Sequence, residues 1–110
     1  MEFLFSYGTL QSKKVQFETF ERELEGHADK LLGYKLAMVE IQDQHVVDLS
    51  GETHHPIAVV TCDLADEILG MVFEITTDEL AQSDLYEVSD YKRVMGRFKS
   101  GKQAWVYVQA

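Results

Sequence analysis

The chain alternates between short apolar runs and polar segments, and the apolar runs have the lengths of strands rather than of buried helices. They are rich in β-branched and aromatic residues, which favour strands. The predicted strands are residues 3–5, residues 31–39 with a bend or bulge at Gly33, residues 57–62, residues 68–75, and a terminal hairpin of residues 91–99 and 103–108. This hairpin is expected to turn near Ser100 and Gly101, because glycine suits tight turns.

Residues 13–25 instead repeat their apolar positions with a helical period. The apolar face carries Phe17, Phe20 and Leu24, spaced by three and then four residues. Ser12 is expected to cap the start of this helix, and Gly26 to end it. Residues 27–30 are then interpreted as a polar connection.

A second helix is expected after the strand of residues 68–75. Thr76 and Glu79 have the spacing of a capping box, in which each side chain hydrogen-bonds the other residue's backbone N–H. The inward-facing residues of this short helix are predicted to be Leu80, Ala81 and Leu85. Residues 42–56 are mostly polar and are interpreted as a loop around one short strand at 45–49.

Together these elements predict a mixed α/β (α+β) domain spanning residues 1–110. A chain of 110 residues suits one hydrophobic core. Two helices are too few to cover both faces of a wide sheet. We therefore expect a small, curved or barrel-like sheet with two main helices.

The charge of the chain argues against two classes of partner. It has 19 acidic and 10 basic side chains and a net charge of −9. Such a surface repels nucleic-acid phosphates and acidic membranes, so we expect neither as a partner. No apolar segment is long enough to cross a bilayer, and no signal peptide is recognisable, so the expected location is the cytoplasm.

Cysteine and histidine give little reason to expect a metal or a disulfide. Cys62 is the only cysteine, and it is predicted to be a small buried residue rather than a nucleophile, since Asp63 beside it raises a thiol pKa. Adjacent histidines on a strand point to opposite faces, so His54 and His55 do not suit one metal ion. The expected cofactor is therefore none, and the expected metal site is none.

Two short segments carry the candidate chemistry. In the first, Tyr7-Gly8-Thr9-Leu10 links the opening strand to the next turn, where free backbone N–H groups can bind a developing negative charge. In the second, Asp84-Leu85-Tyr86-Glu87 is followed by Tyr91-Lys92-Arg93. The residues alone favour a plainer interpretation, in which the first segment is an ordinary strand–turn–helix junction and the second is a solvated helix end.

These segments resemble the two signatures of the gamma-glutamylcyclotransferase-like family, of the gamma-glutamylamine cyclotransferase type. Gly33-Tyr34-Lys35-Leu36 and Gly70 agree with the family in order and spacing. The chain differs at Gln11, Ser12 and Lys13, where the family often has arginine and glycine, and at Ser83, where leucine is common. The middle segment also lacks most of the family's proline-rich loop.

The resemblance implies an enzyme that releases 5-oxoproline from a small-molecule γ-glutamyl amine or dipeptide. It implies Glu87 as the general base, with Tyr7, Gly8, Thr9 and Leu10 binding substrate and its oxyanion. Tyr91 and Arg93 are possible supporting residues, and Arg93 has three candidate partners: the substrate carboxylate, Glu87 or Asp84. The alternatives are a non-catalytic small-ligand binding module on the same fold, or a domain for protein association. The sequence does not define the oligomeric state.

Overall fold

The computed structural model describes residues 1–40, 54–86 and 91–110. The predicted strand at 45–49 lies outside these residues. The elements, in chain order, are β1 (Glu2–Ser6), η1 (Thr9–Gln11), α1 (Lys13–Phe20), β2 (Glu25–Leu32), β3 (Tyr34–Glu40), β4 (His54–Val60), β5 (Glu67–Ile75), α3 (Thr77–Tyr86), β6 (Tyr91–Arg97) and β7 (Gln103–Gln109). The predicted mixed α+β fold with two main helices is confirmed.

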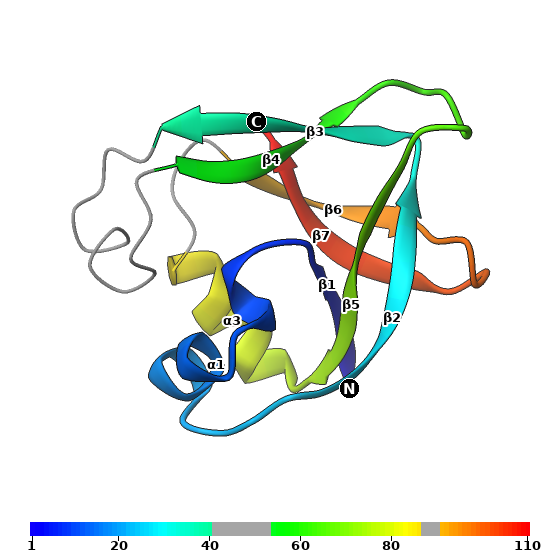
Figure 1. Cartoon of the computed structure of the whole chain (residues 1–110). Coiled ribbons are helices and arrows are strands. Elements are labelled where there is room, and N and C mark those ends of the chain that lie inside the picture. Colours follow the sequence, from blue (N-terminus) through cyan, green and yellow to red (C-terminus); the bar gives the residue numbers. More distant parts are fainter. Residues whose placement is uncertain (41–53, 87–90) are drawn as a thin grey trace.

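Five strands form a curled sheet in the order β2-β5-β1-β7-β6, with β1 parallel to β7 and the other neighbours antiparallel. The two edge strands approach each other at one end, where Leu31 bridges Phe98 and the Lys99 N–H donates to the Lys30 carbonyl. The sheet is therefore barrel-like, as predicted. A curled sheet buries its inner face without needing helices on both sides. Figure 1 shows this curvature, with α1 and α3 together on one side.

A buried carboxylate secures this closure. Asp29 on β2 accepts hydrogen bonds from the Ser100 hydroxyl and, at 3.3 Å, from the Ser100 N–H in the turn between β6 and β7. Burial acts to raise the pKa of Asp29, but the hydrogen bonds from Ser100 and from the Lys30 N–H outweigh it and lower the pKa. The charged carboxylate thus ties the terminal hairpin to β2.

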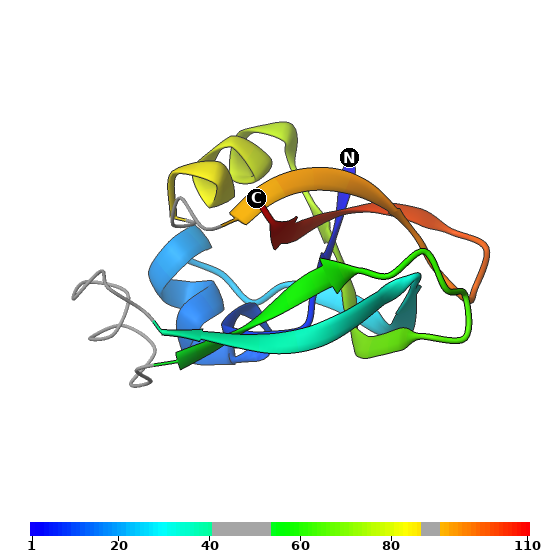
Figure 2. The same ribbon diagram turned by 90° about the horizontal axis from the view of Figure 1, so that it is seen from above.

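β3 and β4 pair only with each other and form a two-stranded ribbon beside the barrel. Figure 2 shows this ribbon from above, separate from the strands of the larger sheet. The chain enters the ribbon at Gly33, which has a φ of 81°. The predicted single strand of residues 31–39 is therefore two strands, β2 and β3, that meet at a glycine corner.

The first helix is shorter than the predicted 13–25. It ends at Phe20, because Glu21 takes the left-handed conformation (φ 57°) and returns its N–H to the Phe17 carbonyl. Ser12 holds the predicted cap position, although its side chain makes no cap bond. Residues 27–30, predicted to be a connection, belong to β2, and Gly26 is a strand residue rather than a helix stop.

Several burial predictions also fail. Leu80 is buried, but Ala81 and Leu85 on α3 are exposed, and Phe17 on α1 is exposed as well. Cys62, predicted to be buried, is exposed with a φ of 60°, since β4 ends at Val60 and the chain turns there.

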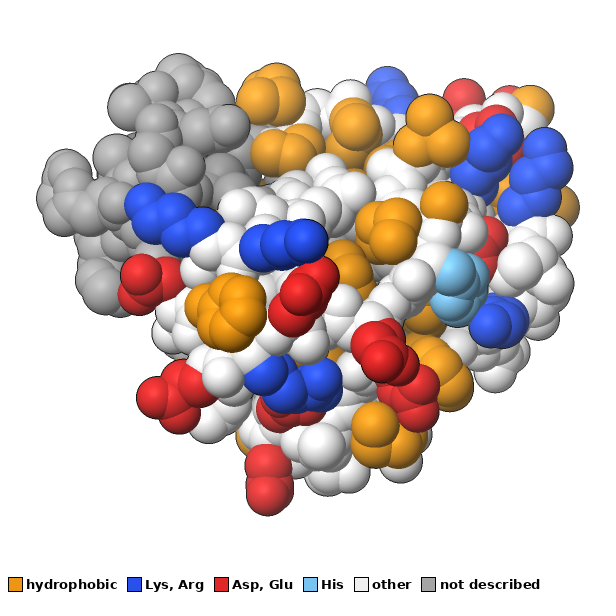
Figure 3. Space-filling view, turned by 60° about the horizontal axis from the view of Figure 1, so that its bottom comes forward, with side chains coloured by type: hydrophobic (Ala, Val, Ile, Leu, Met, Phe, Trp, Pro, Cys, Tyr) orange, Lys and Arg blue, Asp and Glu red, His pale blue; other side chains and the backbone are white. Residues whose placement is uncertain are grey.

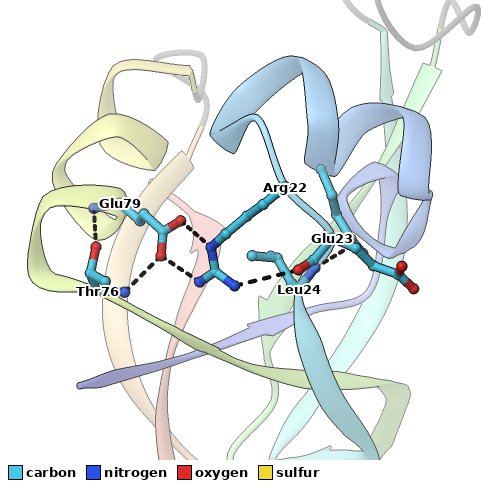
Figure 4. A network of polar contacts seen from close by, with 6 residues as sticks. Arg22, Glu23, Leu24, Thr76 and Glu79 are labelled. Atoms are coloured by element: carbon cyan, nitrogen blue, oxygen red, sulfur yellow. Dashed lines mark hydrogen bonds and ion pairs between the residues drawn. The ribbon is translucent and has the colours of Figure 1, made fainter.

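The capping box of α3 is confirmed and extends into an ion pair. Glu79 accepts from the Thr76 N–H at 2.9 Å, and the Thr76 hydroxyl accepts from the Glu79 N–H at 3.1 Å. The Arg22 guanidinium, beyond the end of α1, donates to both Glu79 oxygens at 2.7 and 2.6 Å (Figure 4). The two helices are thereby joined where they flank the barrel.

Candidate functional site

The first signature forms the junction between β1 and η1. β1 ends at Ser6, whose hydroxyl accepts from the Gly8 N–H at 3.3 Å, and the Gly8 carbonyl accepts from the Gln11 N–H at 3.2 Å. Thr9 and Leu10 are the first residues of η1, so their N–H groups have no acceptor within that turn. The backbone groups that the sequence predicts to bind an oxyanion therefore lie at the start of a short 3-10 turn.

Within the described residues, no close contact requires glycine at position 8. A Cβ built on Gly8 would lie 3.8 Å from the Pro56 ring, which is an ordinary contact, and the φ of Gly8 is not positive. Packing among these residues therefore leaves room for an alanine here.

A buried amide that sequence reasoning did not identify holds the junction in place. Gln16 on α1 donates to the Leu10 carbonyl at 2.8 Å and accepts from the Leu24 N–H at 2.8 Å. Only 3% of Gln16 is exposed. The sequence gives no clear signal for this role, because Gln16 is a polar residue outside the predicted apolar face of the helix.

Tyr7 reaches across the barrel interior. Its hydroxyl accepts from the Ala58 N–H of β4 at 3.0 Å and donates to the Tyr107 carbonyl of β7. The hydroxyl of this predicted substrate-binding residue thus connects the ribbon to the central sheet, and its ring packs against the core cluster that contains Phe5.

Tyr91, from the second signature, reaches the same strand. Its hydroxyl donates to the Pro56 carbonyl of β4 at 2.9 Å. Pro56 and Ala58 are two residues apart on one strand, so Tyr7 and Tyr91 bind neighbouring backbone groups on one edge of β4. The structure thus brings together the first signature and the beginning of β6, which lie far apart in sequence.

Arg93 has one of its three predicted partners. Its guanidinium binds both oxygens of Asp84, at 2.8 and 3.0 Å, and lies 4.4 Å from the centre of the Trp105 ring. Asp84 also accepts from the Tyr107 hydroxyl at 2.7 Å, and this hydroxyl lies 2.7 Å from that of Ser83. Ser83, where the family commonly has leucine, is therefore a buried polar residue with partners.

The predicted base, Glu87, lies outside the described residues. The described chain stops before it at Tyr86, the end of α3, and resumes at Tyr91, the start of β6. Among the described residues, no three His, Cys, Asp or Glu side chains are placed to hold a metal ion. No helix in the described ranges is long and apolar enough to cross a membrane.

Fold and site together define a small barrel-like α+β protein in which two signature segments meet at the edge of a separate ribbon. Residues 4–110 match the family described as gamma-glutamyl cyclotransferase, AIG2-like. The chain therefore belongs to this family, as its two signatures predicted.

Solved structures show the same fold. One Arabidopsis thaliana protein, solved in solution, is 20% identical with a TM-score of 0.75, and the match covers 98% of this chain and 61% of that protein. A Pyrococcus horikoshii crystal structure gives 19% identity and a TM-score of 0.69, with 99% and 78% of the two chains covered. A structure titled gamma-glutamyl cyclotransferase gives 16% identity and a TM-score of 0.73, covering 99% and 66%. No curated protein matches the chain.

Proposed function

We propose that the protein converts a γ-glutamyl amine or γ-glutamyl dipeptide into 5-oxoproline and a free amine. Family membership over residues 4–110 supports this reaction class. The observation that carries the proposal is the convergence of Tyr7 and Tyr91 on Ala58 and Pro56 of β4, at 3.0 and 2.9 Å. Two segments that the reaction needs in one site are thereby tied to one strand.

The reaction is an intramolecular acyl transfer. The α-amino nitrogen of the γ-glutamyl group attacks its own γ-carbonyl carbon, forming the ring C–N bond. The tetrahedral oxyanion then collapses and the bond to the departing amine breaks. Two protons leave the α-nitrogen, one before the attack and one as the ring nitrogen becomes a neutral amide. One of them protonates the departing nitrogen as its bond to carbon breaks, and the other converts the released amine into its ammonium form. Holding the substrate in a conformer ready for attack supplies ~7–11 kcal/mol of the barrier.

Each proposed residue has one role in this scheme. Glu87 takes the ammonium proton and passes it to the departing amine. The backbone N–H groups around Gly8, Thr9 and Leu10 stabilise the oxyanion, and the missing side chain at Gly8 leaves room for the substrate carbonyl. Tyr91 and Arg93 support the site by fixing β4 and the end of α3.

The proposal is tested by measuring 5-oxoproline release from a panel of γ-glutamyl amines and dipeptides, with the parent chain and Glu87→Gln. Glutamine keeps the size of the side chain but does not accept the proton, so turnover should fall ~10²–10⁴-fold. The control is Glu18→Gln, which alters an exposed carboxylate on α1 and should leave the rate unchanged.

Two results would contradict the proposal. Equal turnover by Glu87→Gln and the parent would remove Glu87 from the base role. No turnover of any compound by the parent, combined with measurable binding of one of them, would identify a non-catalytic small-ligand binding module on the same fold.

A further inference from the structure

The β3–β4 ribbon has two faces, and its pairing register defines which residues share each face. Side chains directly opposite each other on antiparallel strands point to the same side. Leu36 pairs with Ala58, and Met38 pairs with Pro56. These four side chains therefore share one face of the ribbon, because strand residues alternate with a period of two.

This face is directed toward the barrel and the candidate site. Ala58 is fully buried in the main core cluster, and Tyr34, on the same face, packs against that cluster. At the other end of the face, the Pro56 ring lies 3.8 Å from the position of a Cβ on Gly8. In Figure 1 the ribbon accordingly lies above the chain that runs from β1 to η1.

Leu36 and Met38 nevertheless remain open to solvent on this inward face. The exposed fractions are 50% for Leu36 and 64% for Met38, whereas Ala58, opposite Leu36, is not exposed at all. Figure 3, viewed from the side of the helices, shows hydrophobic side chains gathered in the upper part of the molecule, where the ribbon lies. The apolar surface of Leu36 and Met38 thus lies one strand away from Ala58 and Pro56, at the usual strand spacing of ~4.8 Å. Ala58 and Pro56 are the residues that contact the first signature.

We infer that Leu36 and Met38 bind the departing amine of the substrate and select amines with an extended apolar chain. The inference rests on the proposed function. The γ-glutamyl group carries an ammonium, a carboxylate and an amide, which suit the polar junction at Gly8, and the chain attached to the amide nitrogen extends beyond it. The β3 surface offers this chain only methyl, methylene and thioether groups, so it discriminates by apolar contact and not by hydrogen bonding.

The test uses γ-glutamyl n-alkylamides of increasing length, from methylamide to hexylamide, with 5-oxoproline release as the readout. Each added methylene that contacts the surface should raise kcat/KM by roughly two- to fourfold, chiefly through KM. In the double variant Leu36→Thr with Met38→Thr, this dependence on length should be largely lost, while the rate on the methylamide should change little. Threonine keeps a high strand propensity, so the ribbon is retained.

The matched control is Leu69→Thr on β5, which removes an apolar side chain that is 71% exposed and lies outside the candidate site. It should retain the full dependence on chain length. The inference is overturned if the parent cyclises all the amides at equal rates, or if the double variant keeps the parent's dependence on length.

Failure of the proposed function would be distinguishable from failure of this inference. If the parent cyclises neither these amides nor any compound of the amine and dipeptide panel, the proposed reaction is excluded, and the amide series is compared by calorimetric binding. An affinity that rises with chain length in the parent, but not in the double variant, would still support the surface. Absent or length-independent binding would refute it.

Discussion

Two glycines show how a single missing side chain serves different purposes. At Gly70 on β5, a Cβ would lie 2.4 Å from the Ser6 carbonyl oxygen and 2.6 Å from the Phe5 ring, so β1 and β5 need glycine in order to pack. At Gly8, the one contact of a Cβ among the described residues would be the Pro56 ring, at 3.8 Å. The first glycine is explained by the fold, and the second by the proposed close approach of substrate.

Replacing each glycine by alanine separates these roles. Gly70→Ala should lower the free energy of unfolding by ~1–3 kcal/mol through overpacking. Gly8→Ala should change it by less than ~0.5 kcal/mol, yet reduce 5-oxoproline release because the methyl group occupies the place of the substrate carbonyl. Urea unfolding and turnover are measured on both variants. If the Gly8→Ala variant turns over substrate as fast as the parent, the proposed position of the substrate carbonyl at Gly8 is wrong.

At the scale of elements, the Arg22–Glu79 pair connects the chain leaving α1 to the first turn of α3. Hydrogen bonds from Arg22, with a further one from the Thr76 N–H, lower the pKa of Glu79 against the opposing effect of burial. The same hydrogen bond raises the pKa of Arg22. A carboxyl whose pKa is lower in the folded chain than in the unfolded one stabilises the fold only where it is ionised.

This pair makes stability depend on pH in a defined direction. The contribution of Glu79 is complete above its unfolded pKa of about 4.3, and it is lost as the pH falls through the lower folded value. Glu79→Gln should therefore reduce the free energy of unfolding by ~1.5–3 kcal/mol at pH 7, with a difference from the parent that shrinks below about pH 4.

Denaturant unfolding of parent and variant across pH measures this difference. The control is Glu23→Gln, which removes an exposed ion pair with Lys13 at 3.2 Å and should cost ~0–1 kcal/mol. A Glu79→Gln deficit that is equal at pH 3 and pH 7 would show that lost hydrogen bonding or packing, and not the charge, explains the effect.

Elements whose structure follows from their own apolar pattern were predicted well, and elements whose structure follows from contacts with distant residues were not. β5 and β7 were predicted closely, because buried strands need apolar runs. β6 was predicted because it alternates and is joined to β7 by a short turn at Ser100 and Gly101. β2 was missed because it is an edge strand whose first residues, Glu25 to Lys30, are largely polar. Leu24 fitted the helical period, but its burial comes from the chain beyond α1, where it packs with Phe20 and Leu80.

The candidate site was predictable only as two separate signatures. Tyr7 and Tyr91 could be singled out from the chain, but their shared target could not. The Pro56 carbonyl and the Ala58 N–H are backbone groups, which every sequence offers, and only the tertiary fold selects them. The Arg93–Asp84 pair was one of three alternatives in the sequence, and the structure shows this pair.

At the scale of the whole molecule, two tyrosine hydroxyls help hold the β3–β4 ribbon against the barrel. Tyr7 binds the Ala58 N–H, and Tyr91 binds the Pro56 carbonyl. These groups lie on the edge of β4 that does not pair with β3 and would otherwise be an open strand edge. The ribbon is therefore attached through side-chain hydrogen bonds, whereas the barrel strands are attached to one another through backbone hydrogen bonds.

Removing either hydroxyl should loosen the ribbon. Tyr7→Phe leaves the Ala58 N–H and the Tyr107 carbonyl without this partner and should cost ~1–3 kcal/mol of stability. The Ala58 amide should also exchange its hydrogen faster, as measured by NMR. Tyr91→Phe should also lower stability, because the Pro56 carbonyl loses this donor.

Tyr34→Phe is the matched control for both changes. Tyr34 packs against the same core cluster, and within residues 1–40, 54–86 and 91–110 no hydrogen bond involves its hydroxyl. Its loss should leave exchange at Ala58 unchanged. Exchange at Ala58 that is equally slow in Tyr7→Phe would show that the hydroxyl does not hold the ribbon.

The parallel pairing of β1 with β7 has a consequence for the order in which the protein folds during synthesis. β7 is made after the other described strands, yet it lies between β1 and β6 inside the sheet. While the ribosome is still producing β7, β1 can already pair with β5. The edge of β1 that will pair with β7 stays open during this time, and so does the edge of β6 that will pair with β7. The barrel therefore forms late, and the emerging chain carries an unpaired apolar edge that neighbouring nascent chains can bind until residue 109 has emerged.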